Sequence, residues 1–135
     1  MTRLAALRWR LGLVPPAADS VPERSKILTE LFATQASVPT KSGSRYLQQL
    51  CKHWSHNLTV EFTQAEGTII FPRDARGADF PGDALVTLTA QPDALGVRID
   101  ATSPAQRNAL KGAVARHLDR FAFREAPLTF DWRDA

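Results

Sequence analysis

Apolar side chains recur at helical spacing in two parts of the chain, residues 43–56 and a segment that begins at Pro104. In the first segment the apolar face consists of Tyr46, Leu47, Leu50, Cys51 and Trp54. In the second it consists of Leu110, Val114, His117, Leu118 and Phe121. At about 100° per residue, each set covers one side of a helix, so we predict two amphipathic α-helices. Ser103 and Gln106 also match a capping box, which predicts where the second helix begins.

Five other segments have the length and composition of β-strands, and turn residues separate them. They are residues 33–38, 58–62, 68–71, 84–90 and 95–101. Turns at residues 64–67 and 91–94 predict two hairpins, whereas the glycines, prolines and aspartates of residues 73–83 predict a long loop. Leu128, Phe130 and Trp132 alternate once more, which predicts a short closing strand. We expect the core to be sealed beside this strand by Phe121, Phe123, Phe130 and Trp132.

The predicted element order is therefore β-α-β-β-β-β-α, with one further short strand if the alternation at Leu128, Phe130 and Trp132 forms one. This order predicts an α+β fold, in which about five strands form an antiparallel sheet and two antiparallel helices cover one face. We assign residues 33–135 to this single domain and residues 1–32 to a basic N-terminal arm, partly helical or mobile. The stripe of Leu4, Leu7, Trp9 and Leu11 in the arm suits either an amphipathic contact or a mobile leader.

Composition narrows the classes of protein that fit. Of the 135 residues, 44% are hydrophobic, which suffices for one ordinary domain with a real core. Residues 1–45 carry seven basic and three acidic side chains, but residues 46–135 carry ten basic and eleven acidic. The folded body is thus nearly neutral, which argues against nucleic-acid binding.

Three features of the sequence predict a cytoplasmic protein. No run of about 18 apolar residues exists, so we predict no transmembrane helix. Arg8 and Arg10 interrupt the apolar N-terminal stretch, which argues against a signal peptide. The single cysteine cannot form an internal disulfide, and this is compatible with a reducing compartment.

All three histidines lie on the two predicted helices. His53 and His56 are three residues apart and lie beside the apolar face of the first helix. His117 lies at the edge of the second apolar face, on the same flank as Arg120 and Arg124. Two antiparallel helices can turn these flanks toward each other and form a shared groove, or can leave both facing outward. The helical spacing alone leaves both arrangements open.

Such a groove would suit two kinds of ligand. Three imidazoles, those of His53, His56 and His117, can hold a transition metal with one position left open. Arginines repel a bare cation but suit a carboxylate, a phosphate or an iron complex with an anionic chelator. If the flanks face outward, the histidines are ordinary solvated or boundary residues.

Other candidate sites are weaker. Cys51 lies on the apolar face, which favours an inert core thiol over a nucleophile. No pair of carboxylates and no Ser-His-Asp arrangement has suitable spacing. The aspartates of the 73–83 loop lack the alternating pattern of a calcium loop, so we expect them to be solvated.

Three strings of residues carry a resemblance to a known family: residues 44–56 (SRYLQQLCKHWSH), 67–72 (GTIIFP) and 117–125 (HLDRFAFRE). They resemble the bacterial domain-of-unknown-function family twenty-two eighteen over about residues 33–132. The resemblance implies a small bacterial domain without an established activity. Some proteins join such a domain to a flavin-dependent siderophore-interacting reductase, which implies a link to iron metabolism by association only. This chain differs by its N-terminal arm and its longer 73–83 loop, and it has no room for a flavin or nicotinamide domain.

We therefore expect a non-catalytic accessory or binding domain, linked to iron or siderophore handling through a His/Arg-lined groove. The candidate ligand-binding residues are Arg45, His53, His56, His117, Arg120 and Arg124. The expected partners are an anionic small molecule or iron chelate and a siderophore-interacting reductase, and no cofactor is predicted. A protein–protein interaction module without a small ligand is the alternative. An enzyme that uses Cys51 or a histidine is the third hypothesis.

Overall fold

The computed structural model describes residues 31–134, so the N-terminal arm predicted for residues 1–32 lies almost entirely outside the described residues. The strands are β1 (Phe32–Pro39), β2 (Thr59–Phe62), β3 (Glu66–Phe71), β4 (Ala84–Ala90), β5 (Ala94–Ala101) and β6 (Arg133–Asp134). The helices are α2 (Gly43–Trp54), the short 3₁₀ helix η2 (Ala75–Gly77) and α3 (Pro104–Phe121). The predicted α+β class and element order are confirmed, and the final short strand is present.

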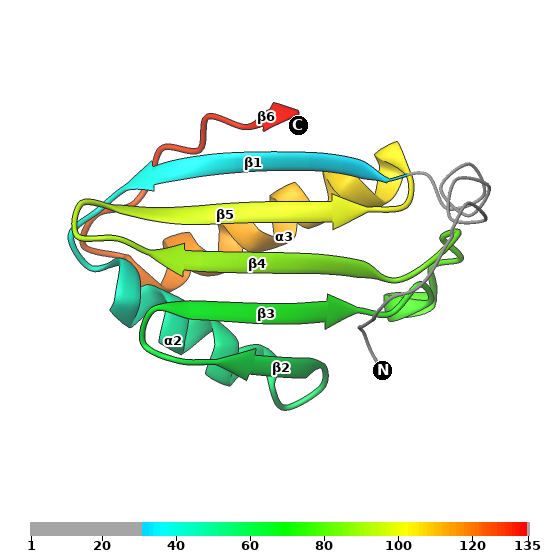
Figure 1. Cartoon of the computed structure of the whole chain (residues 1–135), viewed down its shortest axis with the longest axis horizontal. Helices are drawn as coiled ribbons and strands as arrows, with labels where there is room; N and C mark the ends of the chain where they lie inside the picture. The colour runs from blue at the N-terminus through cyan, green and yellow to red at the C-terminus, as the bar shows by residue number, and fades with distance from the viewer. Residues whose placement is uncertain (1–30, 135) are drawn as a thin grey trace, which may run out of the picture. The chain divides into compact units, whose positions relative to one another are not determined.

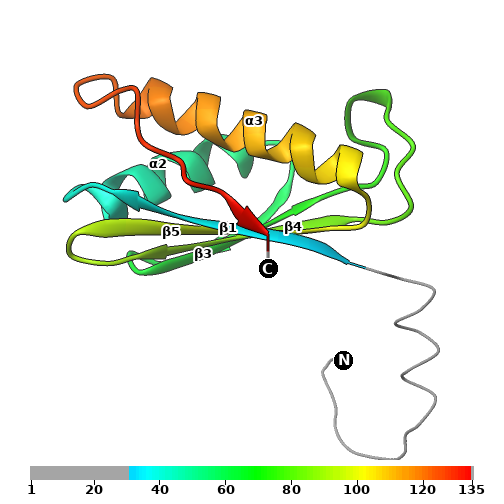
Figure 2. The same cartoon turned by 90° about the horizontal axis from the view of Figure 1, so that it is seen from above.

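The strands form one antiparallel sheet in the order β2-β3-β4-β5-β1-β6 (Figure 1). Both long helices cover the same face of this sheet (Figure 2). α2 follows β1 and α3 follows β5, and these two strands are antiparallel neighbours. Each helix runs back over the sheet from its own strand, so α2 and α3 are antiparallel, as predicted. None of the helices within residues 31–134 is both long and apolar enough to cross a membrane.

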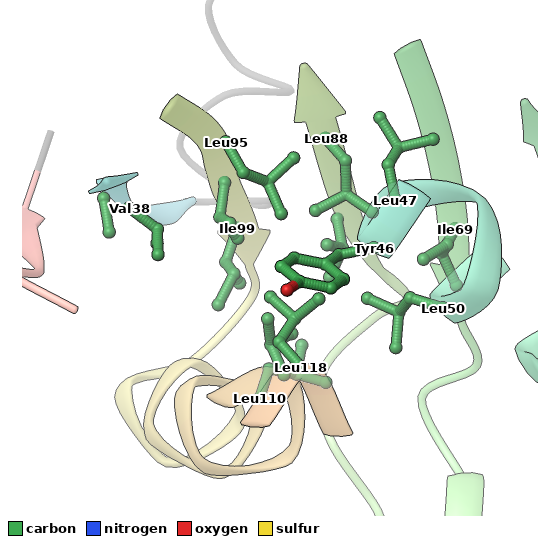
Figure 3. Packing of buried hydrophobic residues seen from close by; sticks show 14 of the residues in the cluster. Val38, Tyr46, Leu47, Leu50, Ile69, Leu88, Leu95, Ile99, Leu110 and Leu118 are labelled. Atoms are coloured by element: carbon green, nitrogen blue, oxygen red, sulfur yellow. The ribbon is translucent and has the colours of Figure 1, made fainter. Parts of the chain in front are cut away.

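The core lies between the two helices and the covered face of the sheet (Figure 3). Period-two alternation in β5 buries Leu95, Val97 and Ile99 and leaves Arg98 exposed between them. The helices contribute Tyr46, Leu47, Leu50, Leu110, Val114 and Leu118. These are the positions that helical spacing assigns to the apolar faces, so the pattern that predicts the helices also builds the core.

The start of α3 is held as the capping box predicts, with one difference. The Ser103 hydroxyl accepts a hydrogen bond from the backbone N–H of Gln106 at 3.0 Å. The buried Gln106 side chain does not return to Ser103; its oxygen accepts from the backbone N–H of Thr102 at 2.7 Å. Its amide nitrogen donates to the carbonyl of Gly82 at 3.0 Å. The glutamine therefore joins the helix start to the end of the long loop.

Two expectations about the C-terminal segment need correction. Leu128, Phe130 and Trp132 do face the core side, but ladder pairing begins only at Arg133, opposite Gln35 of β1. Alternating burial here reflects side chains that cover the edge of the core, without strand hydrogen bonds. Phe123 does not seal the core, because 72% of its surface is exposed. α3 ends at Phe121, buried Ala122 occupies the inner position of the following turn, and Phe123 is directed outward.

Candidate functional site

The two flanks that carry the histidines and arginines face each other between α2 and α3. On α2, Arg45, Gln49 and His53 are spaced four residues apart, so they follow one side of the helix. On the opposing side, His117 and Phe121 belong to α3, and Arg124 follows in the turn after it. Because the helices are antiparallel, Arg45 lies across from Arg124, and His53 lies across from His117. We call this feature the interhelical groove.

The arginine end of the interhelical groove is a cavity of about 250 Å³. It is lined by Arg45, Tyr46, Gln49, Phe121, Phe123 and Arg124. The guanidinium carbon of Arg45 lies 5.5 Å from the ring centre of Tyr46, and that of Arg124 lies 5.6 Å from the ring centre of Phe123. Within residues 31–134, neither arginine forms a salt bridge. Both charges are therefore available to a ligand.

A hydrogen-bonded carboxylate adjoins this cavity. The hydroxyl of Tyr46, a residue that lines the cavity, donates to the carboxylate of Glu125. The hydroxyl of Thr40 lies 3.0 and 3.1 Å from the two Glu125 oxygens. Two hydroxyl groups therefore hold the Glu125 carboxylate at the start of α2. Among residues 31–134, Glu125 forms no salt bridge with an arginine.

The histidine end of the interhelical groove is formed by His53 and His117, whose ring centres are 5.2 Å apart. The Nδ1 atom of His117 lies 2.7 Å from the carbonyl oxygen of Ala113, one turn earlier on α3. In the neutral ring this contact requires the proton on Nδ1, so Nε2 keeps a free lone pair. The His117 ring also lies 4.8 Å from the ring of Trp54. Phe121 lies 6.0 Å from His53 and lines the arginine cavity, so it separates the two ends.

The histidine end is electropositive, and this lowers the pKa of His53. Partial burial is the largest cause, followed by the charges of His117, Arg120 and His56. All three neighbours are cationic or become cationic on protonation, and within residues 31–134 no carboxylate is among the causes of the shift. His53 is therefore predominantly neutral at pH 7, with its ring nitrogens available as donor and acceptor.

The structure does not bring the three histidines into one metal site. Across residues 31–134, no three histidine, cysteine, aspartate or glutamate side chains are grouped to hold an ion. α2 ends at Trp54, so His56 lies in the following turn and the structure pairs only His53 with His117. In the long loop, Arg73 pairs with Asp79, and its backbone N–H donates to Asp83 at 2.8 Å. These aspartates serve the loop's own structure.

Cys51 is a core residue. It has no exposed surface, and burial raises the pKa of its thiol to about 11. Because the thiolate is the reactive form, this cysteine is a poor nucleophile at neutral pH. The geometry thus gives no support to an enzyme based on Cys51.

Several residues of the interhelical groove were not foreseen as site residues. Helical spacing places Tyr46 and Phe121 on the apolar faces, and the sequence predicts that Phe123 seals the core. Gln49 had a usable signal, because it lies four residues from both Arg45 and His53. Arg45 itself was a candidate only through the family resemblance.

Comparison with known proteins gives a family. Residues 35–133 match DUF2218, described as an uncharacterized protein conserved in bacteria. The NMR structure of PA4090 from Pseudomonas aeruginosa is similar, with a TM-score of 0.59 and 32% sequence identity over 76% of this chain and 95% of that chain. No curated protein matches this sequence. Neither description names an activity, a ligand or a partner. The chain belongs to DUF2218, so the resemblance noted from its sequence is confirmed.

Proposed function

We propose that this DUF2218 domain is a cytoplasmic, non-catalytic binding domain that holds a small anion at the arginine end of the interhelical groove. One observation carries the proposal: two guanidinium groups from opposite sides, Arg45 and Arg124, line one cavity and form no salt bridge among the described residues. Guanidinium groups bind carboxylates and phosphates through paired, charge-assisted hydrogen bonds. Even with the charge of Glu125 included, this end carries a net positive charge.

The size of the cavity limits the ligand. A volume of about 250 Å³ is slightly below the about 300–1,000 Å³ typical of sites for drug-sized molecules. It suits a small carboxylate or phosphate better than a complete ferric siderophore. The narrower proposal, a link to iron handling, therefore concerns a small iron chelate such as ferric citrate, or one carboxylate arm of a larger chelator.

Calorimetric titration of the full chain with phosphate, citrate and ferric citrate tests the proposal. Arg45→Gln and Arg124→Gln should each weaken binding of the preferred anion about tenfold or more, because a hydrogen bond to a charged group contributes about 1.5–3 kcal/mol. Arg116→Gln is the matched control, since Arg116 is an exposed arginine of α3 that does not line the cavity. The proposal fails if none of the three anions binds, or if the control loses as much affinity as the groove variants.

One observation favours the alternative, a protein–protein interaction module. Phe123 is a large aromatic residue with 72% of its surface exposed, at the rim of the cavity. Exposed aromatic side chains often anchor protein interfaces. A pull-down with the wild-type domain should then recover one stoichiometric partner, such as a siderophore-interacting reductase, and Phe123→Ala should lose it. Recovery that is unchanged in Phe123→Ala would argue against this surface.

A further inference from the structure

We infer that the histidine end of the interhelical groove is a separate binding site, at which His53 and His117 hold a divalent transition-metal ion such as Zn²⁺. Neither histidine lines the arginine cavity, and Phe121 lies between the two ends. The inference therefore does not rest on anion binding by Arg45 and Arg124. It requires only the two imidazoles and the packing of α2 against α3.

The separation of the two rings suits a shared ion. Their centres are 5.2 Å apart, and the ring planes are inclined by 45°. Two imidazoles that bind one tetrahedral zinc ion, each with a Zn–N distance of about 2.0–2.1 Å, have ring centres about 5 Å apart. The contact is made between two helices that are fixed on the same sheet (Figure 2). The spacing is therefore set by the packed core, and the helices need not move to accept the ion.

The hydrogen bond of His117 prepares it as a ligand. Its Nδ1–H donates to the backbone carbonyl of Ala113 at 2.7 Å. Metal-binding histidines generally use one ring nitrogen in this way, which fixes the ring and leaves the other nitrogen for the metal. The adjacent Trp54 ring, 4.8 Å away, further limits rotation of His117. His117 is thus oriented before any ion arrives.

His53 supplies the accessible half of the site. It is exposed at the C-terminal end of α2, so an ion can enter from solvent and keep water or an anion in its remaining positions. Imidazole ligands favour zinc, copper and nickel over calcium or magnesium. Arg120 adds positive charge near His53. That charge opposes a bare cation and favours an ion that carries a carboxylate or phosphate as a further ligand.

A competing two-histidine site exists in the sequence, and the three histidines of the chain make the test possible. His53 and His56 are three residues apart and can also chelate an ion across one helical turn. The two arrangements share His53 but differ in their second ligand. His117→Ala and His56→Ala are therefore opposite tests of the same question, and His53→Ala should weaken both.

Calorimetric titration of the full chain with Zn²⁺ in a non-coordinating buffer tests which histidines bind the ion. We expect His53→Ala and His117→Ala to weaken binding at least tenfold, and His56→Ala and Arg45→Gln to change it less than twofold. Circular dichroism verifies that each variant is folded. If the His117→Ala variant does not fold, the exposed His56 decides between the two arrangements, because only the competing one uses it. The inference is overturned if Zn²⁺ does not bind or if His53→Ala binds it normally. It is also overturned if His56→Ala loses affinity for Zn²⁺ and a folded His117→Ala variant keeps it. A loss of Zn²⁺ affinity in Arg45→Gln would show that the two ends of the groove form one site, and this would also overturn the inference.

Discussion

Gly67 of β3 allows α2 to lie close to the sheet, and Gly67→Ala should therefore destabilise the domain. An alanine Cβ at this position would lie 2.7 Å from the Sγ atom of Cys51, 3.2 Å from Cβ of Phe62 and 3.4 Å from Cδ2 of Leu47. The shortest contact is about 0.7 Å inside the 3.4 Å at which ordinary contact begins. Cys51 has no exposed surface, so its sulfur cannot move into solvent to relieve the overlap.

Two opposing terms determine the size of the effect. Inserting a methyl group into a packed core costs about 1–3 kcal/mol. Replacing glycine by alanine inside a strand recovers about 0.5–1 kcal/mol, because alanine loses less conformational entropy on folding. The difference is about 0–2.5 kcal/mol, and because the overlap with buried Cys51 is large we expect Gly67→Ala to lower the free energy of unfolding by about 1–2.5 kcal/mol. Gly96→Ala is the matched control, since its nearest contact is an ordinary 3.5 Å and its change should be neutral or stabilising.

A double-mutant cycle in urea, followed by tryptophan fluorescence, isolates the contact. Cys51→Ala removes the sulfur that the new methyl group would meet. In that background the cost of Gly67→Ala should largely disappear, giving a coupling of about 1 kcal/mol or more. An equal cost in both backgrounds, within about 0.5 kcal/mol, would show that the helix–sheet contact is not the cause and would refute the reasoning.

Three other outcomes follow from the described side chains. The Cys51 thiol, whose pKa burial raises to about 11, should react with a thiol reagent at pH 8 only as fast as the protein unfolds; rapid labelling of the native protein would contradict this. Tyr46→Phe removes a hydroxyl donor from Glu125 and should lower the free energy of unfolding in urea by about 1–3 kcal/mol. An unchanged free energy of unfolding would show that this hydrogen bond does not stabilise the fold. The pKa of His53 is lowered from its ordinary value of 6.5, so the unfolded chain takes up this proton first and stability should fall as the pH drops below about 6.5. In buffer with a chelator, His53→Gln should flatten this pH dependence, and an unchanged slope would exclude His53 as its source.

Local sequence patterns predicted the elements of the fold well. Helical spacing placed α2 and α3, and turn residues placed the β4–β5 hairpin, because these signals depend on neighbours along the chain. β6 was misplaced for a physical reason. Alternating burial at Leu128, Phe130 and Trp132 comes from contact with the edge of the core, whereas a strand requires backbone pairing with β1, which only Arg133 and Asp134 achieve. A period of two does not distinguish these cases.

The candidate site was predicted in part. The phase of the two helices permits a shared groove and equally permits flanks that face outward, because the outcome depends on how the helices pack on the sheet. α2 ends at Trp54, two residues earlier than the spacing predicts, so His56 lies in the turn formed by Ser55–Asn57. The sequence predicts that Phe123 helps to seal the core where the second helix meets the last strand, but α3 ends at Phe121 and Phe123 is exposed. Both differences, the earlier end of α2 and the exposure of Phe123, occur at helix ends, where a residue's direction changes within one or two positions.

The antiparallel helix pair explains why the interhelical groove has two chemically different ends. Arg45 and His53 are eight residues apart on α2, which is about 12 Å along a helix. The opposing side runs in reverse, so guanidinium meets guanidinium at one end and imidazole meets imidazole at the other. A small anion cannot contact both ends at once, whereas a ligand about 12 Å long that carries both an anionic group and a metal ion can. If one such ligand occupies the groove, a chelator of that length should bind more tightly when Zn²⁺ is present, whereas phosphate, which reaches only the arginine end, should not.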